Sequence, residues 1–434
     1  MAATTVTNIV EALRYTESEE QLMLALNEES VAWDLLGDSG KRFVRLGGRG
    51  MNIESIVTQL PQRVSGITEG GSLPAAIAMD TAEALFTAQP VVGMWETTWS
   101  AIMRGRRSRE AFKNTVALHQ DGMRTAFSLE MSAELLDDGR GRKAILSAAT
   151  NSVTQNALTS MPSVLRGMVL DCMDDTDDDT KLEDSASVSA VDESVPQFTV
   201  SAAPAGTAAG DYWCREDTTD DSLNDALHLV GLLGIVSNAD PPSVVGDYAG
   251  IDRGTAGNEF WESPVLANSS VNRALTADLL LQAKHVRRRT GGDSTRKGGK
   301  GLCILMNDAI ERRYVELYDA IRIADTGSGP YSGDAGPKDT YTAKGESNFT
   351  FSGIPIHVDV FSPANTVFML DLPTFAIGYV DSKVPRPIDE IFDGQVPFFR
   401  QTSSATFEKA WYWEGQLICT KPRSSVRIDD VAES

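Results

Sequence analysis

The chain has 434 residues, 41% of them hydrophobic and 23% charged, which is ordinary for a protein with a sizeable buried core. This length suggests about two to four structural units. The formal net charge of −22 argues against a dedicated nucleic-acid binder, because affinity for phosphate comes mainly from Lys and Arg. No stretch approaches ~18 consecutive apolar residues, and the acidic N-terminus lacks the basic start of a signal peptide. We therefore expect neither a membrane span nor a secretory leader.

Residues 1–36 carry two short amphipathic patterns, around Asn8–Tyr15 and Ser18–Leu26. Isolated helices shorter than roughly 12–15 residues are marginal in water. We therefore interpret this segment as an arm that lies on something else.

Residues 37–104 have a different composition. Basic and apolar residues are mixed in Arg42–Leu46, and runs rich in β-forming residues occur at Ile53–Leu60 and Val91–Trp99. Frequent glycines and the stretch Glu69–Pro74, which has the composition of a turn, interrupt them. The pattern predicts long strands joined by an extended excursion, with an ordinary surface loop as the alternative. Little in it could form a core of its own, so its strand edges would need pairing or cover.

The most regular pattern in the chain is a helical stripe over residues 109–137. Its apolar positions recur every three or four residues: Phe112, Val116, His119, Met123, Phe127, Met131 and Leu135. Ser108 suits the start of this helix and Gly139 the turn after it. At about 1.5 Å per residue the helix would be roughly 40 Å long, long enough to act as a spine.

After this helix, Val164–Leu170 is a predicted strand, and an acidic run follows at 171–184. Carboxylates at this density raise the question of a calcium site. The spacing does not fit, since a loop of the EF-hand type starting at Asp175 would need glycine at Thr180 and glutamate at Ala186. A solvated acidic loop is the better interpretation. Residues 185–224, rich in Ser, Ala, Thr and Asp, then suggest an insertion or a long surface excursion.

The second half is more regular. Thr276–Thr290 predicts a helix capped by Thr276 and ended by glycines, and Ala309–Ala324 a second one with Asp308 and Glu311 at capping-box spacing. Further strands are expected at Gly301–Met306, Phe349–Val360, Val367–Leu372, Phe375–Val380 and Thr406–Thr420. The last alternates: Phe407, Trp411, Trp413, Leu417 and Cys419 share one face, opposite Glu408, Tyr412, Glu414 and Gln416. Its apolar face could pack against the spine helix.

Motifs for chemistry are nearly absent. The glycine-rich loop Gly291–Lys300 follows a helix and precedes a strand, the reverse of a phosphate-binding loop, and it lacks the Walker spacing. We interpret it as a basic loop, with a contact between Arg287–Arg289 or the loop and an acidic neighbour or packaged nucleic acid as the alternative. The four histidines and four cysteines show no catalytic, zinc or disulfide spacing. The sequence therefore predicts no catalytic, cofactor-binding or metal-binding residue.

The order of these elements resembles the HK97-fold major capsid proteins of tailed bacteriophages. The most specific part is the succession Gly231–Val236, Gly250–Arg253 with Phe260-Trp261, Leu275–Arg289 and Leu302–Met306, followed by Tyr314 and Phe351–Ile356 with Asp359 and Pro363, and by the closing strand Gly415–Asp429. Each piece alone is weak, and the order carries the resemblance.

The resemblance implies an α+β, HK97-like fold. It assigns 1–36 to an N-terminal arm and 37–104 to an E-loop. Residues 105–224 would form the spine helix and strands of the P-domain with an acidic Ser/Asp-rich insertion. Residues 225–385 would be mainly A-domain, and 386–434 the C-terminal P-domain strands. The isopeptide cross-link known in this fold cannot be transferred, because no matching lysine, asparagine and glutamate are found.

The function that the resemblance implies is a non-enzymatic shell subunit. It would assemble in the host bacterial cytoplasm as hexamers and pentamers, which form the virion shell around double-stranded DNA. A separate scaffolding protein, a portal and a decoration or cement protein are the expected partners. Candidate inter-subunit contacts are Arg42, Arg45, Arg49, Glu69, Arg104, Arg106 and Arg107. An encapsulin-like compartment, another virion protein such as a fibre, and an enzyme stay open as alternatives.

Overall fold

The protein is described here from a computed structural model. The described residues are 31–37, 42–47, 51–59, 80–98, 109–157, 164–175, 180–192, 196–215, 219–220, 225–226, 228–242, 246–290, 301–324, 350–387, 399–400 and 406–433. The predicted N-terminal patterns at 8–26, the tip at 69–74 and the basic loop at 291–300 lie outside them.

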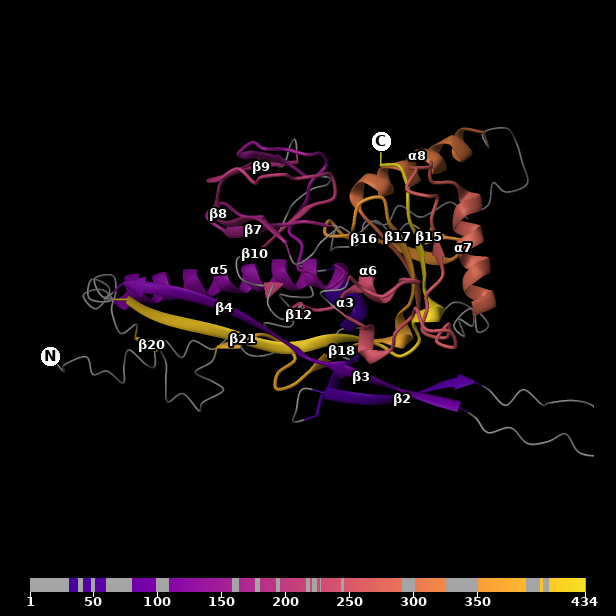
Figure 1. The fold of residues 1–434 in the computed structure, drawn as a ribbon, viewed down its shortest axis with the longest axis horizontal. Helices are drawn as coiled ribbons and strands as arrows, with labels where there is room; N and C mark the ends of the chain where they lie inside the picture. Colours follow the sequence, from indigo (N-terminus) through magenta and orange to yellow (C-terminus); the bar gives the residue numbers. More distant parts are fainter. Residues whose placement is uncertain are drawn as a thin grey trace, which may run out of the picture.

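A long helix on two long strands forms the axis of the molecule (Figure 1). Helix α5 (Arg109–Leu136) lies along β4 (Gln89–Thr98) and β21 (Thr406–Cys419), which pair antiparallel over their whole shared length. The rings of Phe127 and Trp411 lie 6.3 Å apart, so the predicted packing of the last long strand on the spine helix is confirmed. In the described part of the helical stripe, Phe127, Met131 and Leu135 are buried, as the pattern predicts.

Shorter strands extend this layer around β21. They are β1 (Phe43–Arg45), β18 (Phe375–Tyr379), β19 (Arg386–Pro387) and β20 (Phe399–Arg400). The predicted alternation of β21 is only partly correct, because Gln416 is buried rather than exposed. Gln416 shares its face with Ile418, and Leu46 packs over the neighbouring Gly378, so both faces of this end of the strand are covered.

The end of the predicted N-terminal arm belongs to this core. Residues Val31–Gly37 form helix α3, in which Trp33 is fully buried 5.8 Å from the ring of Trp413. The carboxylate of Asp359 accepts a hydrogen bond from Ala32 N and fixes the first turn of α3. Trp33 and Leu36 thus bury their apolar surface within their own chain, so the end of the predicted arm is anchored in the body.

The predicted extended excursion contains a two-stranded hairpin. Strands β2 (Met51–Gln59) and β3 (Asp80–Thr87) pair antiparallel, and Figure 1 shows them extending away from the body at the lower right. The β-rich run predicted at Val91–Trp99 does not belong to this hairpin. It is β4, which pairs with β21.

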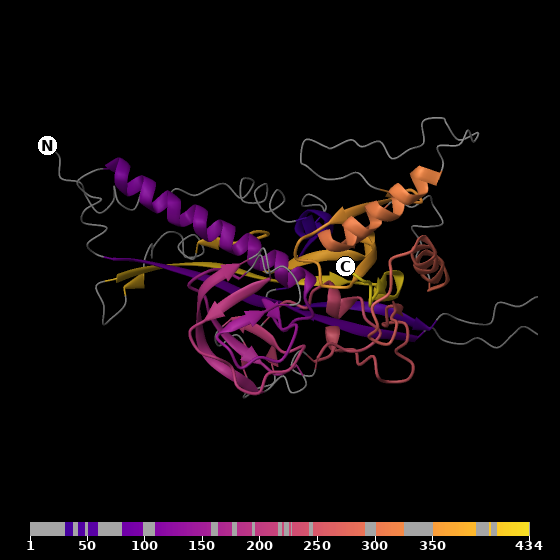
Figure 2. The same cartoon turned by 90° about the horizontal axis from the view of Figure 1, so that it is seen from above.

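The segment that follows the spine helix is a folded domain. Its strands are β5 (Ala144–Ile145), β6 (Thr154–Asn156), β7 (Val169–Met173), β8 (Lys181–Asp192), β9 (Gln197–Val200) and β10 (Tyr212–Arg215). They pair in the order β5-β10-β7-β8-β9-β6, and a bridge between Leu146 and Ala157 joins the first strand to the last. The sheet thus closes into a small barrel beside α5 (Figure 2).

This barrel corrects three expectations. The predicted strand Val164–Leu170 starts later, as β7, and much of the expected acidic loop and the expected excursion at 185–224 is β-structure. Val188, Phe198 and Trp213 are among the buried residues of a core separate from that of the main body. The sequence does not indicate β8 because Ser and Ala fill most of its outward positions, so its hydrophobic alternation is faint.

A mixed sheet with two helices forms the other end of the molecule, at the right of Figure 1. Its order is β13 (Val265–Leu266), β22 (Val426–Ile428), β17 (Val367–Asp371), β14 (Leu302–Met306), β16 (Ile354–Val358) and β15 (Thr350–Phe351). Ile304 faces the core under α7 (Ala277–Thr290) and α8 (Asp308–Ala324), whereas Cys303 and Leu305 face the main core. Both faces of the sheet are thus buried, which explains the continuous apolar run of β14.

Two local expectations in this region need correction. Asn307, not Asp308, caps α8, since its Oδ1 accepts a hydrogen bond from Ile310 N at 2.9 Å. The strand expected at Phe349–Val360 is a hairpin, β15–β16, that turns at Ser352 and Gly353, both with positive φ. The cap of α7 is confirmed, because Leu279 N donates to Thr276 Oγ1.

Short elements connect these layers: β11 (Thr219–Asp220), β12 (Asp225–Ala226), α6 (Leu232–Ile235), η1 (Tyr248–Gly250), η3 (Leu372–Thr374) and η4 (Pro422–Ser424). None of the described helices is both long enough and apolar enough to cross a bilayer.

Candidate assembly surfaces

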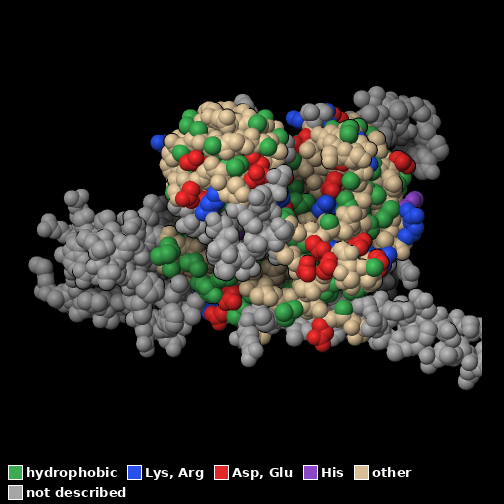
Figure 3. Space-filling view, in the orientation of Figure 1, with side chains coloured by type: hydrophobic (Ala, Val, Ile, Leu, Met, Phe, Trp, Pro, Cys, Tyr) green, Lys and Arg blue, Asp and Glu red, His purple; other side chains and the backbone are tan. Residues whose placement is uncertain are grey.

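The first candidate surface is a groove between β4 and the spine helix. Gly93 lets the strand pass close under the helix, since a Cβ there would lie 2.5 Å from the ring of Phe127. On either side of it, Val92 and Met94 are 52% and 57% exposed. Figure 3 shows hydrophobic side chains at the surface in this region.

The groove encloses a cavity of about 410 Å³. Its apolar wall comes from β4 and from Met123, Ala126 and Phe127 of α5, and its polar end from Glu130, Glu134, Arg215 and His228. Exposed apolar side chains around a concave surface are typical of sites that another chain covers.

The second candidate surface is the β2–β3 hairpin, which is attached to the body at the end of β3. There Phe86 packs edge-on against Tyr248, with ring centroids 5.7 Å apart, and Tyr248 stacks on Trp261 at 5.8 Å. Trp261 Nε1 donates to Tyr248 O, and the Tyr248 hydroxyl accepts a hydrogen bond from Cys419 N at 2.8 Å. The root of the hairpin is therefore held by a buried aromatic stack.

The third feature is a charged joint where the spine helix meets the barrel. Glu130 forms ion pairs with Lys143 and with Arg215, the latter at 2.9 Å. Burial alone would raise the pKa of Glu130, but these two cations outweigh it and lower the pKa to about 2. One turn further, Glu134 Oε1 lies 3.1 Å from His228 Nδ1. The Glu130 carboxylate is thus held as an ion.

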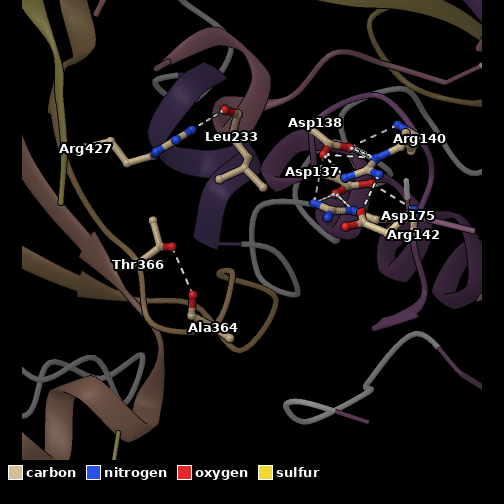
Figure 4. Close-up of polar contacts among 9 residues, drawn as sticks. All are labelled: Asp137, Asp138, Arg140, Arg142, Asp175, Leu233, Ala364, Thr366 and Arg427. Carbon is tan, nitrogen blue, oxygen red and sulfur yellow. Dashed lines mark hydrogen bonds and ion pairs between the residues drawn. The ribbon is translucent and has the colours of Figure 1, made fainter. Parts of the chain in front are cut away.

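The joint continues past the end of the helix, as Figure 4 shows. Asp138 pairs with Arg140 at 2.9 Å and with Arg142 at 3.2 Å, and Arg142 also pairs with Asp137. Arg140 reaches the barrel, where it binds Asp175 at 2.8 Å. Burial opposes the charge of Asp138, yet Arg142 and Arg140 lower its pKa.

Two of the predicted inter-subunit residues are described. Arg45 is exposed, and its Nε donates to Val380 O within its own chain. Arg42 is half-buried, and its charge lowers the pKa of the buried Cys303 thiol, although burial raises it overall to about 12. Arg49, Glu69, Arg104, Arg106 and Arg107 lie outside the described residues.

The residues capable of chemistry are dispersed. Cys172, Cys214, Cys303 and Cys419 are all buried and free. Arg287 is also buried, and it binds Asp371 at 3.0 Å and Ser424 O, so it is not part of a basic surface. These residues support the fold.

One carboxylate cluster was not expected from the sequence. Asp240, Asp247 and Asp252 place carboxylate oxygens within 4.8 Å of one another on partly exposed loops. No sequence motif relates these three positions, and exposed carboxylates often gather in this way without an ion.

No family model and no curated protein matches the sequence. Among solved structures, the chain is similar to one from the cyanophage A-1(L) capsid asymmetric unit, with a TM-score of 0.53 and 14% identity over 90% of each chain. It is also similar to a structure of Mycobacterium phage Patience (TM-score 0.43, 9% identity, 96% of this chain and 86% of that one). A third likeness is to an encapsulin complex of Synechococcus elongatus (TM-score 0.40, 9% identity, 91% and 86%).

At these identities the likenesses concern the fold, and only the first has a TM-score above 0.5. It covers nearly the whole chain. The expected α+β fold of the HK97-like capsid proteins is therefore confirmed.

Proposed function

We propose that this protein is a phage major capsid protein, which assembles as hexamers and pentamers into an icosahedral head shell around double-stranded DNA. The observation that carries the proposal is the fold, which matches a chain of the cyanophage capsid over nine-tenths of its length. The solved structures that resemble it are shell assemblies, which supports a structural role rather than an enzymatic one.

Two features of the isolated subunit support association with further copies. The β2–β3 hairpin pairs with no other strand among the described residues, and Val92 and Met94 expose apolar surface beside the groove. Both features gain cover if neighbouring copies lie against them. Repeated head-to-tail contacts of this kind close into rings.

The remaining parts of the proposal follow from the resemblance. Residues 1–36, 37–104, 105–224, 225–385 and 386–434 correspond to arm, E-loop, P-domain, A-domain and closing P-domain strands, with α3 as the buried end of the arm. The predicted arginines and Glu69 serve contacts between copies. A separate scaffolding protein, a portal and a cement protein are the proposed partners, in a virion assembled in the host cytoplasm without a membrane.

The net charge of −22 fits a container wall that encloses DNA without sequence-specific binding, because it does not clamp a polyanion that must later leave. Dense ordered contacts between the inner wall and DNA in an assembled particle would contradict this part of the proposal.

The test is electron microscopy and light scattering of the purified protein, alone and with a scaffolding protein. We expect rings of five and six or closed particles tens of nanometres across. A monomer that stays small with the scaffold present would overturn the proposal. Closed particles that hold a protein cargo and no portal would identify a compartment shell instead.

Deletion of Gly66–Ala76, outside the described residues, tests the E-loop assignment. We expect a soluble protein that forms no closed shells, with an unchanged melting temperature of the body. Normal shells from this variant would refute the assignment.

A further inference from the structure

The barrel is attached to the main body with little apolar packing. The chain enters and leaves it at the same place, because Lys143 N donates to Trp213 O at 2.8 Å. Its core is separate from that of the body. Beside the joint, the barrel adds a satellite cluster of only three buried side chains, Met173, Tyr212 and Cys214. Apolar packing therefore contributes little to the attachment.

Charged groups take the place of this packing. The last turns of the spine helix and the residue after it supply Glu130, Glu134 and Asp137, and Asp138 follows directly. The connection and the barrel supply the opposite charges, with Lys143 fully buried and the Arg140 side chain 8% exposed. Arg140 also lies over the Tyr212 ring, 4.8 Å from its centroid, and so bridges the connection and a barrel strand.

The segment that returns from the barrel, at His228, closes the same joint. The ring of His228 packs against Gly141, where a Cβ would lie 2.3 Å from His228 Nε2, and Gly141 has a φ of +65°. A side chain at 141 would push His228 away from Glu134. The outgoing connection, the returning segment and the helix are thus fitted to one arrangement.

Buried ion pairs are weak contributors to stability, because desolvation offsets much of their attraction. Their geometry is nevertheless tightly constrained, because a buried charge that loses its partner raises the free energy of the folded state. We propose that this joint is an orientation lock, which holds the barrel at one angle to the spine helix and whose neutralisation lets the barrel move as a rigid body while both cores stay folded. This inference does not depend on the proposed shell function.

The lock can be tested on the unassembled subunit by the distance between two spin labels. Ser189→Cys on the barrel and Gln282→Cys on α7 place labels at exposed positions, whereas all native cysteines are buried. The joint variant combines Glu130→Leu, Lys143→Met and Arg215→Met, so that both ion pairs of Glu130 are removed with all their charges. The control variant removes the exposed pair Arg313–Glu316 on α8 by Arg313→Met and Glu316→Leu.

We expect one narrow distance distribution for the parent and the control, and a distribution at least twice as broad for the joint variant. Calorimetry should show both folded units retained. A second variant, Asp138→Leu with Arg140→Leu, leaves the Asp137–Arg142 pair in place and serves if the first fails to fold. A broad distribution in the parent, or a narrow one in a folded joint variant, would overturn the lock.

Discussion

The barrel and the β2–β3 hairpin both project from the spine layer, yet they solve the problem of unpaired strands differently. The barrel joins its first strand to its last and buries its own core. The hairpin has two strands, and its buried residues Ala84 and Phe86 belong to the core of the body. Closure makes the barrel self-sufficient, whereas the open hairpin depends on the body at its root.

The largest expected loss of stability comes from a substitution in the barrel core. Trp213 is fully buried, with its ring 5.8 Å from that of Phe198. Trp213→Ala should cost about 4–5 kcal/mol, because it opens a cavity in a small core. Calorimetry should show the barrel melting earlier while the body does not. The matched variant Trp413→Ala should lower the melting temperature of the body and leave that of the barrel unchanged. If barrel and body melt together at one lowered temperature in both variants, the barrel is not a separate unit.

The hairpin root should respond differently. Phe86→Ala removes a fully buried ring from the aromatic stack and should destabilise the body by about 3 kcal/mol. Hydrogen exchange should speed up in β2, β3 and around Tyr248 but not in the barrel. Faster exchange in the barrel strands would contradict the separation of the two regions.

Acid should weaken the charged joint between the barrel and the spine helix. Since the folded pKa of Glu130 is lowered to about 2 from 4.5, its contribution to stability is complete above pH 4.5 and is lost as the pH falls towards 2. We expect a loss of about 2–3 kcal/mol across this window. Glu130→Gln should be less stable at pH 7 and should show a flatter pH dependence in denaturant titrations. An unchanged pH slope would mean that Glu130 is not held by its cations.

The smallest effect on stability is expected at the groove. Met94 is 57% exposed, so Met94→Ser should change the free energy of unfolding by no more than about 0.5 kcal/mol. If neighbouring copies cover the groove, the variant should nevertheless assemble less completely in light-scattering assays. Glu316→Ser, on the exposed face of α8, is the control. Equal assembly of both variants would place the groove outside the contacts between copies.

The sequence by itself determined the elements whose signal is local. The 3.6-residue stripe of α5, the strict alternation at Trp411 and Trp413, and the cap at Thr276 each depend on neighbours within a few turns or residues, so their positions were predicted correctly. Their order along the chain was enough to indicate the fold.

Only the tertiary structure decided the barrel, the burial of α3 and the charged joint. Strand β10 pairs with β5 and β7, far away in sequence, and strand β8 carries Ser or Ala at most of its exposed positions. Trp33 is buried because Trp413 and Asp359 meet it from distant segments. Likewise, the sequence does not predict the ion pair between Glu130 and Arg215, because the partner of a charge is set by tertiary packing rather than by periodicity.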